Sequence, residues 1–297
     1  MNSLRPPFSY PGGKRDNEVQ RLVWSSLGVD VPTYIEPFCG SAAMLLGRPG
    51  GAGKYEVVGD ENGLVANVWR SIKLAPEKVA EHCNWPPCEI DLAVRAKFLR
   101  NWKETEACLL SSPSYCDPLM AAWWIWCQSV SFSPDWLTQK SPPIAKPYRR
   151  GILSPGTQIP ELLSALAERL HRVTIGHGSW TKLVTPSALG FYNTGTTPTG
   201  IFFDPPYPEE ELDCGSDPDV ARDVEKWCRE NGDDERLRIV LCGHVGDYSL
   251  DGWRVENWGG SRGWGRARRG TNEAIWISPH CISTETSQRS LFEQGNP

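Results

Sequence analysis

The stretch Ile201-Phe202-Phe203-Asp204-Pro205-Pro206-Tyr207 decides how the rest of the chain is interpreted. Three consecutive apolar residues predict a short buried strand, and the two prolines prevent a strand or a helix from continuing past Asp204. We therefore expect the Asp204 carboxylate at the carboxyl end of a strand, where open α/β sheets bind their ligands.

Asp204 and its neighbours combine two hydrogen-bond acceptors with an aromatic ring. The Asp204 carboxylate and the Pro205 carbonyl are expected to lie side by side, and Tyr207 follows three residues after Asp204. This combination suits a flat ligand that carries an amino group. The two acceptors would take the amine hydrogens while Tyr207 stacks on the ring.

Length and composition narrow the class of protein. The 297 residues are enough for one large α/β domain with an insertion, or for two modest domains. No apolar run approaches the roughly 20 residues of a membrane span, and no signal peptide is recognisable, so we expect a soluble intracellular protein. The ten cysteines contain no C-x-x-C pair, and the five histidines lack metal spacing around them, which predicts reduced thiols and no metal site.

The net charge is −5 and the isoelectric point is near 5.6, which argues against a protein that coats nucleic acid unspecifically. A local basic patch can still set the field at a binding cleft. Two basic clusters are candidates for phosphate contact, and a solvated loop is the alternative for each. The first contains Lys140, Lys146, Arg149 and Arg150, and the second contains Arg262, Arg266, Arg268 and Arg269.

Three earlier segments place polar residues at turns and strand ends. A turn is predicted in the segment Phe8-Ser9-Tyr10-Pro11-Gly12-Gly13-Lys14, because proline and glycine favour turns, and a helix is predicted to follow over residues 15–27. In residues 33–43, a short strand is stopped by Glu36-Pro37 and followed by small residues that begin a helix. A second strand ends in Asp60, which is placed to accept hydrogen bonds from ribose hydroxyls; a helix N-cap is the alternative.

The motifs and their order resemble a known family. Asp-Pro-Pro-Tyr at a strand end resembles the catalytic motif of amino-methylating DNA methyltransferases. The order of a Gly-Gly-Lys segment, Glu-Pro-Phe-x-Gly, an acidic strand end and Asp-Pro-Pro-Tyr resembles the α-type arrangement of the Dam-like DNA adenine-N6 methyltransferases. The resemblance implies an α/β fold: a Rossmann-like S-adenosylmethionine-dependent methyltransferase sheet with a mostly helical target-recognition insertion.

The resemblance also implies roles for single residues. The expected catalytic residues are Asp204, Pro205, Pro206 and Tyr207. The residues expected to bind the cofactor S-adenosylmethionine are Tyr10, Lys14, Glu36, Pro37, Phe38, Gly40, Asp60 and Asp204. The chain departs from the family at Ala42-Ala43, where a second glycine is frequent, and this puts the cofactor geometry in question.

The same resemblance divides the chain. Residues 1–76 and 159–283 are expected to form the catalytic domain, residues 77–158 the target-recognition insertion, and residues 284–297 a flexible tail. Helices are predicted over residues 62–73, 118–130, 160–172 and 220–231, further strands over residues 173–177 and 237–242, and a closing antiparallel pair over residues 252–258 and 272–278. The tryptophans at 123, 124 and 126 are interpreted as core, with base stacking as the alternative.

The sequence therefore predicts a site-specific enzyme that methylates the N6 amine of adenine in double-stranded DNA. The alternatives are methylation of the cytosine N4 amine and a non-catalytic DNA-binding protein on the same fold. Pro87-Cys88 lacks the strand that a cytosine-carbon methyltransferase needs before its nucleophile. We expect a monomer or weak dimer, without metal or membrane partner, in the cytoplasm of a bacterium or phage-infected host cell. There it would act as the modification enzyme of a restriction-modification system. The sequence does not predict its recognition site.

Overall fold

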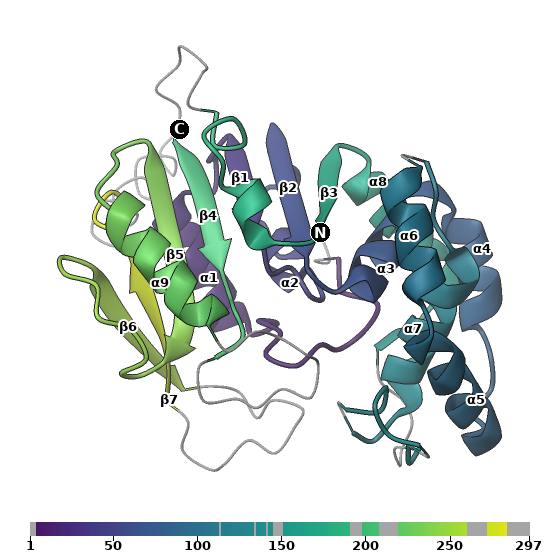
Figure 1. The fold of residues 1–297 in the computed structure, drawn as a ribbon. Coiled ribbons are helices and arrows are strands. Elements are labelled where there is room, and N and C mark those ends of the chain that lie inside the picture. Colours follow the sequence, from purple (N-terminus) through teal and green to yellow (C-terminus); the bar gives the residue numbers. More distant parts are fainter. Residues whose placement is uncertain are drawn as a thin grey trace.

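The computed structural model describes residues 4–112, 114–133, 135–140, 142–144, 151–190, 198–207, 219–259 and 272–283. The strands of these residues form one sheet in the order β3-β2-β1-β4-β5-β7-β6 (Figure 1). Their bounds are β1 Thr33–Glu36, β2 Tyr55–Asp60, β3 Val173–His177, β4 Thr199–Phe203, β5 Leu237–His244, β6 Arg254–Gly259 and β7 Asn272–Ile277.

The first five strands of the sheet are parallel, and β7 runs antiparallel to both β5 and β6. The chain proceeds from β1 outward to β2 and β3, and then continues on the other side of β1 with β4 and β5. The direction of winding thus reverses between β1 and β4, which makes their carboxyl ends the switch point of the sheet. This architecture confirms the expected fold class, a Rossmann-like methyltransferase sheet.

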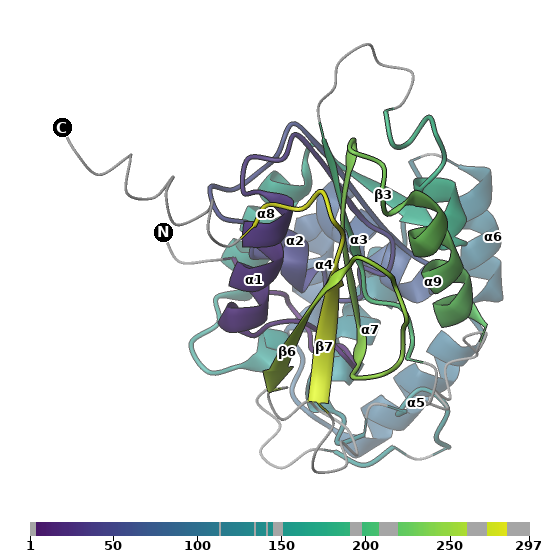
Figure 2. The same cartoon turned by 90° about the vertical axis from the view of Figure 1, so that its left-hand side faces the viewer.

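The alternation of side chains along the strands builds a hydrophobic layer on each face of the sheet. In β4, Phe202 packs on one face, while Ile201 and Phe203 pack on the other. Figure 2 shows α1, α2 and α8 on one side of the strands and α9 on the other. The helices that cover the sheet are α1 Asn17–Leu27, α2 Ala43–Leu46, α3 Gly63–Leu74, α8 Ile159–Leu170, the short 3₁₀ helix η2 Trp180–Leu183 and α9 Val220–Asn231.

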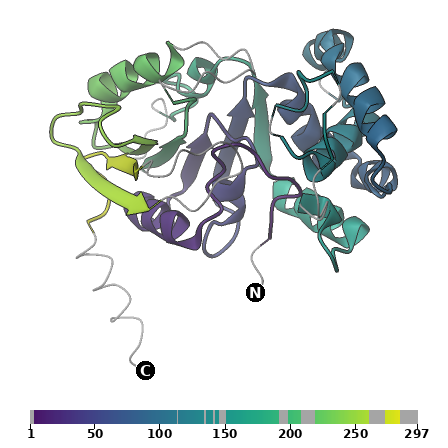
Figure 3. The ribbon, with the colours of Figure 1, turned by 90° about the horizontal axis from the view of Figure 1, so that it is seen from below.

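Helices of the predicted insertion gather beside the β3 edge of the sheet (Figure 3). They are α4 Pro76–Cys83, α5 Glu89–Arg100, α6 Lys103–Ser111, α7 Pro118–Val130 and the 3₁₀ helix η1 Gly151–Leu153. Trp124 and Trp126 of α7 are buried, which confirms the core interpretation for both. Trp123 is half-buried and lies against Phe98 with ring centroids 5.8 Å apart.

Local capping explains where several helices begin. Asp16 accepts a hydrogen bond from the Glu18 amide, so α1 begins at Asn17 rather than at Arg15. Asn62 accepts from the Leu64 amide and caps α3. The N-cap alternative for Asp60 is therefore wrong. No helix in the described ranges is long and apolar enough to cross a membrane.

Candidate active site

The catalytic stretch lies at the switch point of the sheet. Strand β4 ends at Phe203, so Asp204 emerges at the carboxyl edge between β1 and β5. All four residues of the buried strand segment 200–203 are shielded from solvent, whereas the Asp204 side chain keeps 15% of its surface exposed. Pro205 is buried and Pro206 half-buried behind it. A rigid turn thus holds one partly accessible carboxylate at the sheet edge.

Lys14 lies directly on this carboxylate. Its ammonium donates hydrogen bonds to Asp204 Oδ1 at 2.9 Å and to Asp204 Oδ2 at 3.0 Å. It also donates to the Gly12 carbonyl at 2.7 Å, so the Gly-Gly-Lys turn is fastened to its own side chain. The N-terminal segment therefore reaches across the sheet edge and brings a cation to the catalytic motif.

Burial is the largest single influence on Lys14 and lowers its pKa, but the negative charges around it, chiefly those of Asp204 and Glu273, together outweigh burial, so the pKa is raised. The Glu273 carboxylate lies 3.7 Å from the Lys14 ammonium. Lys14 consequently stays protonated throughout the working range of pH, as the shared counter-ion of two carboxylates.

Tyr207 is almost fully buried, and its ring packs edge-on against His244 with centroids 4.5 Å apart. Its hydroxyl accepts a hydrogen bond from Lys14 at 2.9 Å and lies 3.3 Å from Asp204 Oδ1. Burial, followed by the charge of Asp204, raises the pKa of Tyr207, which keeps the phenol neutral. The ring thus forms the wall beside the carboxylate.

The second half of the crevice joins the ends of β1 and β2. Asp60 accepts hydrogen bonds from the Gly40 amide and from the Asn62 amide, both at 2.9 Å. Burial raises the pKa of Asp60 to about 6, against the lowering effect of these two bonds. Each carboxylate oxygen retains a free lone-pair direction, so Asp60 can still accept from a hydroxyl-bearing ligand.

The turn after β1 is held in left-handed backbone conformations. Gly40 has φ +42°, and a Cβ there would lie 2.6 Å from a ring carbon of Tyr10. Ala42 also has a positive φ, 48°, and is the only non-glycine residue in the described ranges that does. The departure from the family at Ala42 thus leaves a backbone conformation that glycine adopts more easily.

Glu36 and Phe38 serve the scaffold of the crevice. Glu36 Oε2 accepts from the Tyr34 hydroxyl at 3.0 Å and from the Leu45 amide at 3.1 Å, which ties β1 to α2. Burial raises the pKa of Glu36 to about 8. Pro37 is buried, and the Phe38 ring packs against Trp180 and Phe203.

The structure brings the predicted site residues into two connected groups. Lys14, Asp204 and Tyr207 form one group, and Tyr10, Gly40 and Asp60 form the other. They meet at the N-terminal turn, where the Gly13 amide donates to the Tyr10 carbonyl at 3.0 Å.

Of the predicted DNA-contacting residues, Lys140 is exposed. The other seven lie outside the described residues: Lys146, Arg149, Arg150, Arg262, Arg266, Arg268 and Arg269.

Two residues of the site were missed by the sequence reasoning. His244 ends β5, and Glu273 lies opposite it in β7. Asp60 and Asp204 were predicted because each is a polar residue at the carboxyl end of a strand, and His244 meets the same condition. Glu273 carries a different signal: because β7 is antiparallel to the other strands, its beginning lies at the edge where the parallel strands end.

No protein-family model matches the chain, and no curated protein matches its sequence. Among solved structures, the chain is similar to two structures of one enzyme, the rRNA methyltransferase AviRa from Streptomyces viridochromogenes, determined at 1.5 and 2.4 Å. The first aligns with a TM-score of 0.40 and 16% identity, and the second with a TM-score of 0.36 and 17% identity. Both alignments cover 97% of this chain and 91% of the other. Action on ribosomal RNA is a property of that enzyme.

Proposed function

We propose that this protein uses S-adenosylmethionine to methylate the N6 amine of adenine in double-stranded DNA. The observation that carries the proposal is the convergence of four separate sequence motifs on one crevice. Asp204, Lys14, Gly40 and Asp60 come from four different segments. At the switch point of the sheet, hydrogen bonds join Lys14 to Asp204 and Gly40 to Asp60. Ligands of open α/β sheets bind at such a point.

The residues of the crevice fit the cofactor. Asp60 is a buried carboxylate that two backbone amides orient, and it retains acceptor capacity for ribose hydroxyls. The Tyr10 ring lies against Gly40, where a side chain would not fit, and so belongs to the same part of the site. When bound, S-adenosylmethionine supplies an electrophilic methyl group.

Asp204 and Pro205 make the amine of a flipped-out base reactive. The adenine amine is a poor nucleophile because its lone pair is delocalised into the ring. Hydrogen bonds from the amine to the Asp204 carboxylate and to the Pro205 carbonyl favour a tetrahedral nitrogen and stabilise the positive charge that grows on it. Asp204 is then the nearest base for the proton that the nitrogen loses.

Lys14 restricts how the amine can approach. Its ammonium occupies one lone-pair direction of each Asp204 oxygen, and the Tyr207 hydroxyl donates to Oδ1 as well. The amine must therefore use the remaining direction of Oδ2 or displace Lys14 toward Glu273. The ion pair also keeps Asp204 in a fixed orientation. Preorganisation of this kind is the principal means by which active sites stabilise developing charge.

Double-stranded DNA as the partner, and the two basic clusters as its contacts, belong to the same proposal. Lys140, exposed within residues 77–158, is the described member of those clusters. Because the adenine amine is paired inside a duplex, the base has to leave the helix before it can reach Asp204.

The test is to incubate the protein with unmethylated duplex DNA and labelled S-adenosylmethionine, digest the DNA to nucleosides and identify the product by mass spectrometry. Label on the adenine amine supports the proposal. Label on the cytosine amine would establish the alternative substrate with the same Asp204 chemistry. Label in RNA offered in parallel, and none in DNA, would overturn the proposed substrate.

Asp204→Ala provides the matching mutational test. We expect a loss of about 10²–10³-fold or more in kcat, because the principal acceptor for the amine is gone. Binding of S-adenosylmethionine should weaken but stay detectable by calorimetry. Asp251→Ala, an exposed acid in the turn before β6, is the control that leaves kcat unchanged. Full activity in the Asp204 variant would exclude the mechanism.

A further inference from the structure

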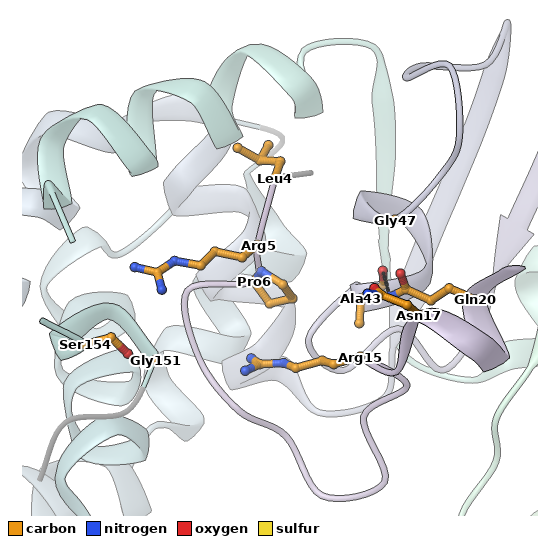
Figure 4. Close-up of a pocket in the computed structure, with 10 residues that line it drawn as sticks. All are labelled: Leu4, Arg5, Pro6, Arg15, Asn17, Gln20, Ala43, Gly47, Gly151 and Ser154. Atoms are coloured by element: carbon orange, nitrogen blue, oxygen red, sulfur yellow. Dashed lines mark hydrogen bonds between the residues drawn. The ribbon is translucent and has the colours of Figure 1, made fainter. Parts of the chain in front are cut away.

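A small cavity lies beside the N-terminal segment and apart from the Asp204 carboxylate. Its volume is about 160 Å³, and it lies between the start of α1, the α2 segment and η1 (Figure 4). The polar residues that line it are Arg5, Arg15, Asn17, Gln20 and Ser154. None of its ten lining residues is acidic.

The two arginines of this cavity make it a site of concentrated positive charge. Figure 4 shows both guanidinium groups pointing toward the side of the cavity that carries Ser154. Arg15 donates to the Ser9 hydroxyl at 3.2 Å, and Arg5 donates to the Thr157 hydroxyl. Among the described residues, no carboxylate lies within ion-pair distance of either guanidinium. Each guanidinium has five N–H donors, so most of this donor capacity is unassigned.

The electrostatic state of Arg15 fits an anion site. Both arginine side chains are solvent-exposed in part. Partial desolvation beside the cavity, followed by the nearby charge of Arg5, lowers the pKa of Arg15 to about 10, so both groups are charged at neutral pH and repel each other. The nearest acid in the chain, Asp16, is turned away to cap α1 through the Glu18 amide at 2.7 Å. An anion between the two guanidiniums would relieve the repulsion that the protein itself leaves in place.

The size of the cavity selects the kind of anion. Sites for cofactors and drug-sized molecules usually have about 300–1,000 Å³, so this cavity suits a single compact group. Paired guanidiniums match the geometry of phosphate through parallel N–H···O bonds.

The cavity is connected to the candidate active site through adjacent residues of the chain. Arg15 follows Lys14 in the chain, and the two side chains serve the cavity and the Asp204 carboxylate respectively. Gln20 donates to the Lys14 carbonyl at 2.9 Å and to the Ala43 carbonyl at 3.0 Å, which fixes the backbone between the two sites. The backbone at Lys14 and Arg15 therefore connects the cavity with the carboxylate proposed to receive the target amine.

We propose that Arg5 and Arg15 together hold one backbone phosphate of the nucleic acid whose base enters the Asp204 site. This inference rests on the proposed function, since it takes the DNA substrate as the source of the phosphate. It adds a contact that positions the strand, and it assigns no role in the methyl transfer itself.

The salt dependence of DNA binding tests the proposal. The slope of log affinity against log salt is measured by fluorescence anisotropy with duplex DNA for wild type, Arg5→Gln, Arg15→Gln and the double variant. Each single variant should lower the magnitude of the slope by about 0.9, the value for one phosphate contact. The double variant should lower it no further, because both arginines share that phosphate. Arg172→Gln, an exposed arginine just before β3 that does not line the cavity, should leave the slope unchanged.

Two outcomes of this experiment would overturn the proposal. An unchanged slope in every variant removes the cavity from the DNA interface. A double variant that loses twice as much as either single variant shows two independent contacts rather than one shared phosphate. Thermal unfolding of the variants checks that the fold is retained, which we expect because both arginines are exposed in part.

A second experiment with inorganic phosphate tests whether the cavity binds a free phosphate ion or a phosphate of the DNA backbone. Phosphate should raise the melting temperature of wild type above that in chloride at equal ionic strength, and the double variant should lose this shift. A phosphate shift without any change of DNA slope would assign the cavity to a free anion and overturn the nucleic-acid source. Failure of the proposed function is distinct from both outcomes: the protein would then bind no DNA, or transfer no methyl group to it.

Discussion

The ion pair of Lys14 and Asp204 joins residues that are 190 positions apart in the chain. Two acidic side chains, Asp204 and Glu273, approach the same point of the sheet edge, and their mutual repulsion would otherwise raise the cost of keeping both ionised. The buried ammonium removes that cost. A lysine in a glycine turn thereby becomes part of the catalytic carboxylate's environment, a role that its local sequence does not reveal.

The pKa of Asp60 leads to a prediction at the same scale. The carboxyl group titrates at about 6 in the folded protein, above its ordinary value of 3.8, because burial disfavours its charged form. Only the carboxylate offers both oxygens as acceptors to ribose hydroxyls. Below pH 6 a proton must leave before binding, so we expect the affinity for S-adenosylmethionine to fall by up to about tenfold per pH unit as the pH drops from 6 to 5.

Isothermal titration calorimetry between pH 5 and 8 measures this dependence. Asp60→Asn cannot ionise, so it should bind more weakly than wild type at pH 8, with an affinity that no longer depends on pH around 6. A wild-type affinity that stays constant from pH 7 to 5 would show that Asp60 does not contact the cofactor, or that its pKa is not raised.

At the scale of elements, the turn between β1 and α2 depends on Gly40. Its positive φ and the Tyr10 ring leave no room for a Cβ, which would lie 2.6 and 3.1 Å from two ring carbons. We expect Gly40→Ala to destabilise the protein by about 2–4 kcal/mol, since backbone strain and displacement of the ring add together. The variant should also bind S-adenosylmethionine more weakly, because the displaced turn would move the residue 40 amide that orients Asp60.

Gly50→Ala is the matched control for this prediction. Gly50 also has a positive φ, 78°, but nothing lies within 4 Å of the Cβ that alanine would add. Gly50→Ala should lower the free energy of unfolding by about 1–2 kcal/mol, from backbone strain alone, and should leave the cofactor affinity unchanged. Urea unfolding compares the two variants, and equal losses would mean that the contact with Tyr10 contributes nothing.

Local sequence predicted many of the elements because their signals are themselves local. The predicted helix over residues 118–130 has the observed bounds of α7, since Asp117 caps the Met120 amide and Pro118 suits the first turn. The predicted bounds of α9 also agree with the structure.

The site was predictable only in part. Asp204 and Asp60 follow from strand ends, which periodicity and prolines reveal. Long-range contacts have no such local signal: the approach of Glu273 requires knowing that β7 is inserted antiparallel beside β5, and the Arg5 and Arg15 cavity requires the course of the N-terminal segment. Sequence motifs therefore predicted the two carboxylates of the candidate site, whereas the charges around them follow from the topology.

At the scale of the whole molecule, the helical insertion and the sheet share one hydrophobic cluster. Trp126 of α7 and Trp69 of α3 belong to this cluster together with Val58 of β2. Asn67 of α3 donates to the Asp117 carbonyl at 2.9 Å and accepts from the Asp117 amide at 2.9 Å, which fixes the start of α7. Such continuous packing leaves no polar seam along which the two parts could separate.

Trp126→Ala tests whether the insertion and the sheet unfold together. The side chain is fully buried and donates to the Trp85 carbonyl at 2.8 Å, so its removal should cost about 3–5 kcal/mol. If the core is cooperative, amide hydrogen exchange in β4 and β5 should accelerate to the same extent as in α7. Phe98→Ala, which removes a ring that is 58% exposed on α5, should change exchange little in either part. Faster exchange confined to α4 through α7, with β4 and β5 unchanged, would instead show that residues 77–158 fold as a separate unit.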